Sequence, residues 1–482
     1  MNLKREGDLF RNAMERMDKR MENRFRGRRS EQVAYFSAYK GHIHNPGMGI
    51  ISMAVSDHMV MGYCAADREK ADREKPFTLT RKMLQEVNRL PFIDNIYIRV
   101  GWNDVQKRAG KLDLCPAFET AVEEAERSGK SWGFRIMQCS PSNPSGHLMP
   151  EFLEGRIPMV PMPDDGSYGP RPKLRPVYTE EYLKYWDEML HLLGERFDAD
   201  RSLEYADISG FGFWGEGHHS GDADAGDPAG LNAVLERLIA SHQSAFPRTP
   251  MVMNLHLSEC WEAGQKALEQ GGWTRRDCYY KWFQAHQAQD GLNRRGDAAM
   301  IFETIMPGLT MEDDEDPSFR HSSLGTADRL CDYGANYATV GFNPQDTLYA
   351  AHMLPMLFQP LNERLGYRLR PSIVWKIENG DGNWSLVLGM VNDGCANPPG
   401  ELTFLAESNG RSAQVTENGG GFGGRMRLVE LPLPEGHDDD IAVRLQMRMG
   451  QKQYAVRFAA DTGEREAPFE LHIHLNHKEW NG

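Results

Sequence analysis

Residues 205–220 read Tyr-Ala-Asp-Ile-Ser-Gly-Phe-Gly-Phe-Trp-Gly-Glu-Gly-His-His-Ser. Bulky apolar residues alternate with small ones in the first half, which predicts a buried strand over residues 205–213. In the second half, Glu216 stands between two glycines and follows Trp214 by two positions. Glycine lets a backbone approach other groups closely, so we expect the Glu216 carboxylate to leave the strand end and point into a cavity. A strand followed by a solvated acidic turn is the alternative.

Strand and helix signals alternate on both sides of this stretch. Strands are predicted at residues 49–55, 95–100, 131–137, 205–213, 251–255, 292–295, 300–305 and 336–342. Helices are predicted at 79–90, 116–128, 179–195, 231–246, 324–333 and 347–365, and one or two more within 261–289. Eight strands with crossover helices predict a (β/α)8 TIM barrel of the α/β class. One irregularity is that only residues 296–299 separate the sixth and seventh strand candidates, which is too short for a crossover.

The alternation of strand and helix signals ends near Gly366. Short β-prone runs at 384–391, 401–405, 426–433, 441–447, 453–458 and 469–475 are separated by turns such as Asn-Gly. They predict a C-terminal all-β sandwich. The expected domains are an N-terminal amphipathic helix (residues 1–32), the barrel (33–366) and the sandwich (367–482). The amphipathic helix suggests a docking element, and with it a homo-oligomer.

The composition and the charge argue against several classes of binding partner. A net charge of -14 and a pI near 5.6 argue against nucleic acid, whose phosphates an acidic surface repels. No run of 18 apolar residues and no secretory signal is present, so we expect neither a membrane partner nor export. The seven cysteines are scattered without metal-ligand spacing, which favours reduced thiols and a cytoplasmic location.

Several motifs occur in an order that resembles one family. They are Asn-Pro-Gly-Met-Gly at 45–49, Ile-Arg-Val-Gly-Trp-Asn-Asp-Val at 98–105, Trp-Gly-Glu at 214–216 and Leu-Gly-Tyr-Arg at 365–368. Together the chain resembles clan-A type glycoside hydrolases, and especially β-galactosidase-like barrels followed by a β-sandwich. The resemblance implies hydrolysis of an oligosaccharide or glycoside by two carboxylates, with no cofactor and no metal.

The resemblance also implies residue roles. The family acid/base lies at the end of the fourth strand, where Glu216 stands, and the nucleophile or base lies on the seventh, where Glu303 stands. Asp297 and Glu259 are the reserve candidates for the second role. The family has Asn before the acid/base, and this chain has Gly215 instead.

Further side chains are expected at the strand ends, where polar groups would bind sugar hydroxyls and Trp rings would stack on the sugar. They are Arg99, Trp102, Asn103, Trp214, His218, Asn254, His256, Asn293, Arg294 and Asp297.

Two other functions stay open at the level of sequence. A carbohydrate-binding barrel without catalysis is favoured by Gly215 and by the short spacing before Glu303. A metal-dependent hydrolase on the same barrel is motivated by five histidines, which are His42, His44, His218, His219 and His256.

Overall fold

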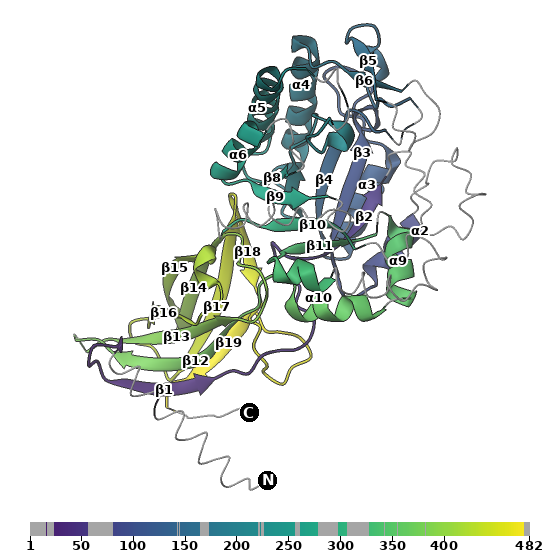
Figure 1. Ribbon diagram of the computed structural model, residues 1–482. Helices are drawn as coiled ribbons and strands as arrows, with labels where there is room; N and C mark the ends of the chain where they lie inside the picture. The colour runs from purple at the N-terminus through teal and green to yellow at the C-terminus, as the bar shows by residue number, and fades with distance from the viewer. Residues whose placement is uncertain are drawn as a thin grey trace.

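The computed structural model describes residues 16, 24–55, 81–141, 143, 145–163, 173–219, 222, 226–255, 261–277, 297–305, 327–341, 343–353, 355–380 and 382–476. Within these residues the chain forms a closed barrel with surrounding helices, followed by antiparallel sheets (Figure 1). None of the helices in these ranges is long and apolar enough to cross a membrane.

The barrel has eight parallel strands, and β11 closes it by pairing with β2. In order around the barrel they are β2 (Gly49–Val55), β3 (Ile93–Gly101), β4 (Ser131–Met137), β7 (Leu203–Asp207), β8 (Met251–Asn254), β9 (Trp273–Arg276), β10 (Met300–Ile305) and β11 (Tyr337–Val340). The prediction of a (β/α)8 TIM barrel followed by a β-sandwich is confirmed.

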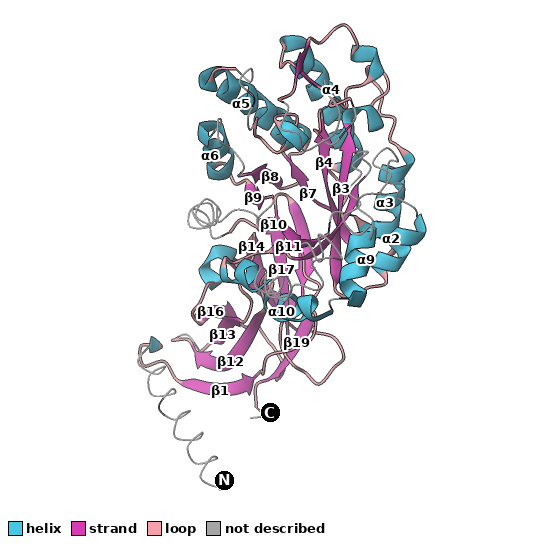
Figure 2. Cartoon of the chain, turned by 45° about the vertical axis from the view of Figure 1, so that its right-hand side comes forward, coloured by secondary structure: helices cyan, strands magenta, loops and turns pink. Residues whose placement is uncertain are grey.

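Helices lie outside the strands (Figure 2). They are α2 (Arg81–Asn88), α3 (Pro116–Arg127), α4 (Glu180–Phe197), α5 (Pro228–Ala245), α6 (Trp261–Glu269), α9 (Pro344–Met353) and α10 (Phe358–Arg364). Side chains alternate across each barrel strand. On β3, Ile96 and Ile98 pack in the core shared with the helices, whereas Tyr97 packs in the core that continues through the barrel. This alternation aims every second residue of a strand, Arg99 among them, into the barrel.

The sixth strand is β9, and its position corrects the sequence prediction. Residues 273–276 were expected to be helical, but α6 ends at Glu269 and Gly271 follows with φ of 103°. A four-residue strand that carries two arginines shows neither the length nor the apolar pattern of a core strand. The other candidate, residues 292–295, lies outside the described residues. With β9 sixth, β10 is the seventh strand, and the short spacing before it is no longer a difficulty.

The fourth strand, β7, is shorter than expected. It ends at Asp207, and the chain from Ile208 to Gly212 is a loop rather than the second half of the strand. The alternation of bulky and small residues at 208–213 resembles a strand, but Gly210 and Gly212 have φ of 85° and 74°, which lie outside extended backbone. Glu216 is therefore carried by a loop beyond the strand.

Two antiparallel sheets form the C-terminal unit. One contains β1 (Ser30–Tyr35), β12 (Leu369–Glu378), β13 (Trp384–Asn392) and β16 (Arg427–Pro432). The other contains β14 (Glu401–Ser408), β15 (Arg411–Asn418), β17 (Asp440–Met449), β18 (Lys452–Val456) and β19 (Glu470–His474). The barrel was expected to begin at residue 33. However, β1 spans residues 30–35 and pairs with β12, so it belongs to a sheet of the sandwich. The predicted N-terminal helix lies almost wholly outside the described residues.

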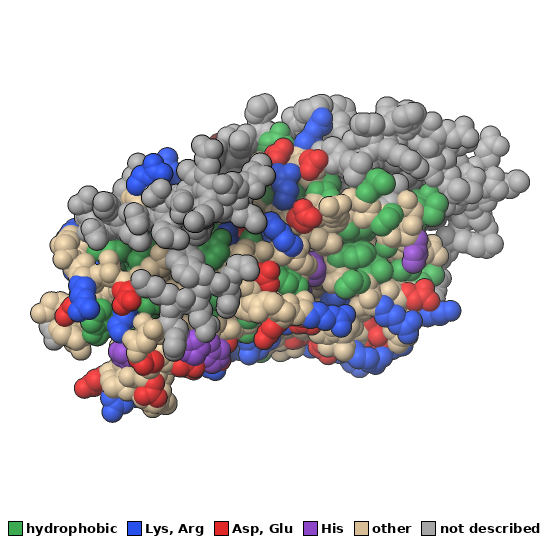
Figure 3. All heavy atoms as spheres, turned by 90° about the horizontal axis from the view of Figure 1, so that it is seen from below, with side chains coloured by type: hydrophobic (Ala, Val, Ile, Leu, Met, Phe, Trp, Pro, Cys, Tyr) green, Lys and Arg blue, Asp and Glu red, His purple; other side chains and the backbone are tan. Residues whose placement is uncertain are grey.

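The sandwich contacts the end of the barrel where the strands begin. From β18, Lys452 Nζ donates hydrogen bonds of 2.8 Å to the carbonyl oxygen of Leu203 and to Thr249 Oγ1. Leu203 is the first residue of β7, and Thr249 precedes β8. Acidic and basic side chains are interspersed on the face seen in Figure 3. Because Lys452 contacts the start of the strands, their carboxyl ends lie at the opposite end of the barrel from the sandwich. Barrel active sites lie at these carboxyl ends.

Candidate active site

Charged side chains from neighbouring strands meet inside the barrel at its carboxyl end. Arg99 of β3 is the register partner of Arg135 of β4. On the other side, Phe302 of β10 pairs with Arg276 of β9, so the next residues, Glu303 and Asp277, are also neighbours. All four of these charged side chains are buried. The parallel register therefore brings two arginines and two acidic residues into one layer without any long loop.

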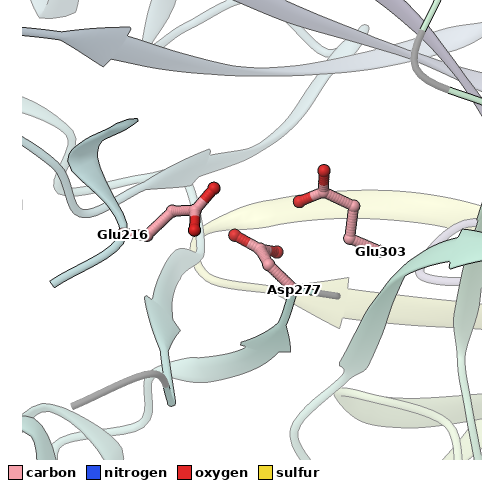
Figure 4. Close-up of side chains that lie close together, drawn as sticks. All are labelled: Glu216, Asp277 and Glu303. Carbon is pink, nitrogen blue, oxygen red and sulfur yellow. The ribbon is translucent and has the colours of Figure 1, made fainter. Parts of the chain in front are cut away.

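Three carboxyl groups converge in this layer. Glu216, Asp277 and Glu303 each have an oxygen within 4.8 Å of the others, and each side chain is buried. Figure 4 shows the three carboxyl groups pointing toward one another, from the loop after β7, the end of β9 and the middle of β10. Like charges at this distance repel strongly in a buried site, so cations or a shared proton must accompany them.

Arg135 supplies much of the positive charge. Its Nη1 lies 3.2 Å from Glu216 Oε1, and its Nη2 donates to Asp277 Oδ2 at 3.0 Å. Nε and Nη2 also donate to Asp207 Oδ2 at 3.2 and 3.1 Å. Burial alone would lower the pKa of Arg135, but the surrounding negative charges raise it well above its usual value. This guanidinium stays charged and joins three carboxylates, from the end of β7, the loop after β7 and the end of β9.

Arg99 lies between the two glutamates. Its Nη1 is 3.3 Å from Glu303 Oε1, and its Nη2 is 4.0 Å from Glu216 Oε1. The side chain is only 2 % exposed, so water does not screen these contacts. Arg99 was predicted at this position, and the structure places it there.

Glu216 is presented by a series of tight turns. Gly215 and Gly217, on its two sides, have φ of 71° and 84°, which a side chain would strain. Trp214 has φ of 53° although it is not glycine, a conformation that costs energy of order 1–3 kcal/mol and is concentrated at functional sites. The amide of Phe213 donates to the carbonyl oxygen of His218 at 2.8 Å and closes the loop.

Glu303 holds its proton more strongly than a free glutamic acid. Burial raises its pKa well above the usual value, and the negative charge of Asp277 raises it further, while Arg99 lowers it in part. A hydrogen bond between the Asp277 and Glu303 side chains also favours the protonated form of Glu303. Two carboxyl groups that share one proton in this way are found where acid–base chemistry is done.

Other predicted residues join this layer. His218 Nε2 is 3.6 Å from Glu216 Oε2, and Asn254 Nδ2 donates to Asp277 Oδ2. Trp214 lies next to His218, with ring centroids 5.9 Å apart, and is half-buried. These three residues therefore stand where a ligand of the carboxylates would also meet them.

Three predicted residues, Trp102, Asn103 and Asp297, do not join it. Trp102 packs in the core, where its Nε1 donates to Gln106 Oε1 at 2.9 Å and its ring meets Trp186 edge-on. Asp297 precedes the start of β10, and its Oδ2 accepts from Asn418 of the sandwich at 2.8 Å. Its place is thus at the far end of the strand from Glu303. Trp102 was misread because a core indole and a sugar-binding indole look alike in sequence.

Asn103 follows Trp102 in a short 3-10 turn. Its backbone N–H donates to the carbonyl oxygen of Leu148 at 2.9 Å, and among the described residues its buried Oδ1 has no hydrogen-bond donor. His256, Asn293, Arg294 and Glu259 lie outside the described residues.

Asp277, Arg135 and Asp207 were missed by the sequence prediction. Arg135 and Asp207 stand in segments that were correctly read as strands, at inward-facing positions near the carboxyl end. A search for charged residues within buried strands would have found both, because a charge there needs a partner. Asp277 was missed because residues 261–289 were predicted to be helical. The two glycines at 271 and 272 could have indicated that the helix ends before Asp277.

The three carboxylates are spaced as ligands of a metal ion would be. However, Arg135 and Arg99 occupy positions within 4.0 Å of the same carboxyl oxygens, and an added cation would be repelled by both guanidinium groups. The site therefore fits a metal ion poorly.

His42 and His44 do not join the site either. His42 Nε2 and His44 Nδ1 contact Asp94 Oδ1 at 2.8 and 2.9 Å, near the start of β3. These two ring nitrogens are already engaged by one buried carboxylate at the opposite end of the barrel strand from Arg99. The cluster of five histidines that motivated a metal-dependent hydrolase is therefore divided, with His42 and His44 away from His218.

The pKa of His42 predicts how stability depends on pH. Burial would lower the pKa of His42, but the charge of Asp94 and its hydrogen bond outweigh burial and raise it. A raised pKa in the folded state contributes stability that is complete below about pH 6.5 and is lost as the pH rises through the folded value. We expect the urea midpoint of the wild type to fall between pH 6 and roughly 9 by more than that of His42→Gln. Parallel curves for the two proteins would contradict this role of His42.

No family model and no curated protein sequence matches the chain. Among solved structures, it is similar to endo-glycoceramidase II from Rhodococcus sp., with 12% identity, a TM-score of 0.40, and coverage of 83% of this chain and 98% of that one. It is also similar to the catalytic domain of beta-amylase from Paenibacillus polymyxa, with 10% identity, a TM-score of 0.39, and coverage of 63% and 94%. Similarity at this level does not bear on chemistry, so the function proposed below rests on the side chains of the barrel.

Proposed function

We propose that the protein is a glycoside hydrolase that cleaves an oligosaccharide or glycoside with Glu216 and Glu303. The observation that carries the proposal is the meeting of these two carboxyl groups inside the carboxyl end of the barrel. Hydrolysis of a glycosidic bond needs one carboxyl that donates a proton and one that is ionised. A pair whose surroundings differ as much as those of Glu216 and Glu303 supplies both forms at one pH.

The spacing favours retention of configuration. The nearest oxygens of the two carboxyl groups lie within 4.8 Å. Retaining glycosidases have carboxyl groups about 5–5.5 Å apart, so that one attacks the anomeric carbon directly, whereas roughly 6.5–9.5 Å leaves room for a water in inverting enzymes. This separation lies nearer the retaining range than the inverting range. We therefore expect a covalent glycosyl-enzyme and a product of the same anomeric configuration as the substrate.

The remaining side chains fit the binding of a sugar. Asn254 and His218 can exchange hydrogen bonds with hydroxyl groups, and the half-buried ring of Trp214 offers a face for stacking. Arg99 and Arg135 hold the carboxylates in place. A β-galactosidase-like specificity, a cytoplasmic location and a homo-oligomer stay predictions.

The experiment is hydrolysis of a panel of nitrophenyl glycosides of both anomers, with the configuration of the first-formed sugar followed by proton NMR. We expect one sugar class to be cleaved, with the starting configuration in the product. Release of the inverted anomer would contradict the retaining mechanism. No cleavage of any member, or of short oligosaccharides tested alongside, would favour a barrel that binds carbohydrate without cleaving it.

A further inference from the structure

The two glutamates have opposite electrostatic surroundings. Glu216 Oε1 faces the guanidinium groups of Arg135 at 3.2 Å and Arg99 at 4.0 Å, and its Oε2 faces His218 at 3.6 Å. Cations close to a buried carboxyl favour its ionised form. The contacts of Glu216 are therefore those of a carboxylate.

Glu303 faces more negative charge. One cation, Arg99, lies 3.3 Å from its Oε1, whereas Asp277 and Glu216 each bring a carboxyl oxygen within 4.8 Å. Asp277 is its neighbour in the register of β9 and β10. Anionic neighbours favour the neutral form of a buried carboxyl.

Asp277 is contacted by two hydrogen-bond donors. Its Oδ2 accepts hydrogen bonds from Arg135 Nη2 at 3.0 Å and from Asn254 Nδ2. Both donors stabilise a carboxylate and cannot accept a proton from it. A proton shared by the Asp277 and Glu303 pair therefore resides on Glu303, which donates to Asp277.

We propose that Glu303 is the proton donor of the reaction and Glu216 the ionised partner, with Asp277 as the positioning residue that keeps the proton on Glu303. This reverses the roles that the family resemblance implies for the two glutamates. The inference rests on the proposed function for its chemistry, although the place of the proton can be tested without a substrate. Its direction agrees with the raised pKa of Glu303.

Other charged groups around the pair are balanced. Asp207 accepts from Tyr97 Oη at 2.6 Å and from Arg135, and it forms an ion pair with Arg275 at 2.6 Å. Among the described residues, Arg99, Arg135 and Arg275 are the buried cations that contact these groups, and Asp207, Glu216, Asp277 and Glu303 are the buried acids. The charge of Asp207 is thus answered by two arginines, so its influence on Glu303 is small beside that of Asp277.

The reaction then balances as follows. As the bond between the anomeric carbon and the leaving oxygen breaks, Glu303 gives its proton to that oxygen and Glu216 forms a bond to the anomeric carbon. Glu303, now a carboxylate, takes a proton from the water that attacks this carbon, and the bond to Glu216 breaks. Both glutamates return to their starting forms, and one water is consumed.

The first test needs no substrate. Infrared difference spectra at pH 7 between the wild type and each Gln variant detect a carboxyl group that is protonated, since its carbonyl absorption is separate from that of a carboxylate. We expect Glu303→Gln to remove a protonated carboxyl and Glu216→Gln to remove a carboxylate. In Asp277→Asn the proton of Glu303 should be lost at lower pH than in the wild type. Loss of the protonated signal in Glu216→Gln, with its retention in Glu303→Gln, would overturn the proposal.

The second test uses the aryl glycoside that the protein cleaves. Dinitrophenolate is a good leaving group and departs without being protonated. The loss of a proton donor therefore lowers the cleavage rate mainly for substrates with poor leaving groups. We expect Glu303→Gln to slow a dinitrophenyl glycoside far less than a phenyl glycoside, by a ratio of at least about 10² from the usual contribution of a general acid. Glu216→Gln should slow both alike. The opposite pattern would overturn the assignment, whereas an inert panel with the expected infrared result would sink the proposed function alone.

Discussion

Glu216→Gln is expected to lower kcat/KM for any glycoside the protein cleaves by at least about 10⁴-fold, the upper end of what a positioned acid or base contributes. The amide keeps the volume of the side chain but can neither attack the anomeric carbon nor carry a negative charge. It also removes the negative charge that faces Arg135 Nη1 at 3.2 Å, although its amide oxygen can still accept that hydrogen bond. The measurement is the initial rate of nitrophenol release.

Glu204→Gln is the matched control for this prediction. Glu204 is also a buried acidic residue, but it lies on β7, next to the first residue of the strand. Its oxygens accept from Tyr337 Oη at 2.6 Å, from Ser131 Oγ at 2.7 Å and from the Gly47 amide. Folded protein of this variant should keep its rate within about tenfold. If both variants lost activity equally, the loss in Glu216→Gln would reflect the removal of a buried acidic residue in general. The catalytic role of Glu216 would then be contradicted.

Arg135→Met is expected to destabilise the protein by about 3–5 kcal/mol, the range for removing one partner of a buried ion pair. The guanidinium is fully buried and touches Asp207, Glu216 and Asp277. Methionine fills part of the space but leaves these carboxylates with fewer cations. The measurement is the urea midpoint followed by tryptophan fluorescence at pH 7.

Arg127→Met provides the comparison. Arg127 pairs with Glu124 at 2.7 Å, but its side chain is 60% exposed. Exposed ion pairs contribute only about 0–1 kcal/mol, so the midpoint should barely move. If Arg135→Met unfolded no earlier than Arg127→Met, the buried carboxylates would not depend on Arg135 for their charge balance.

Much of the fold could be predicted because its strands are buried on both faces. Runs such as residues 95–100 and 131–137 are too apolar to be anything but core, and their alternation with helices implies parallel strands. The positions of Glu216 and Glu303 followed from counting strands. Glu303 is on the seventh strand only because β9 is the sixth, which the sequence concealed.

The rest could not be predicted because it depends on tertiary partners. Arg275 and Arg276 make β9 look like a surface segment, yet Arg275 is buried against Asp207 and stacks over the Tyr97 ring at 4.1 Å. Burying any one of these charges without the others would cost free energy. No single segment of the sequence therefore shows that its charged residues are buried in the barrel. Asp277 was missed for the same reason, since its contacts come from β4, β8 and β10.

The main proposal is that Glu216 and Glu303 together cleave a glycosidic bond. Its most direct test is incubation with a panel of dinitrophenyl 2-deoxy-2-fluoroglycosides, which slow the release of a glycosyl-enzyme, followed by mass spectrometry of the intact protein and its peptides. We predict one added glycosyl group on Glu216. Its presence on Glu303 would exchange the two roles and leave the function intact. If no sugar of the panel labelled the protein, or if the label lay outside these carboxylates, the account of this barrel as a retaining glycoside hydrolase would be contradicted.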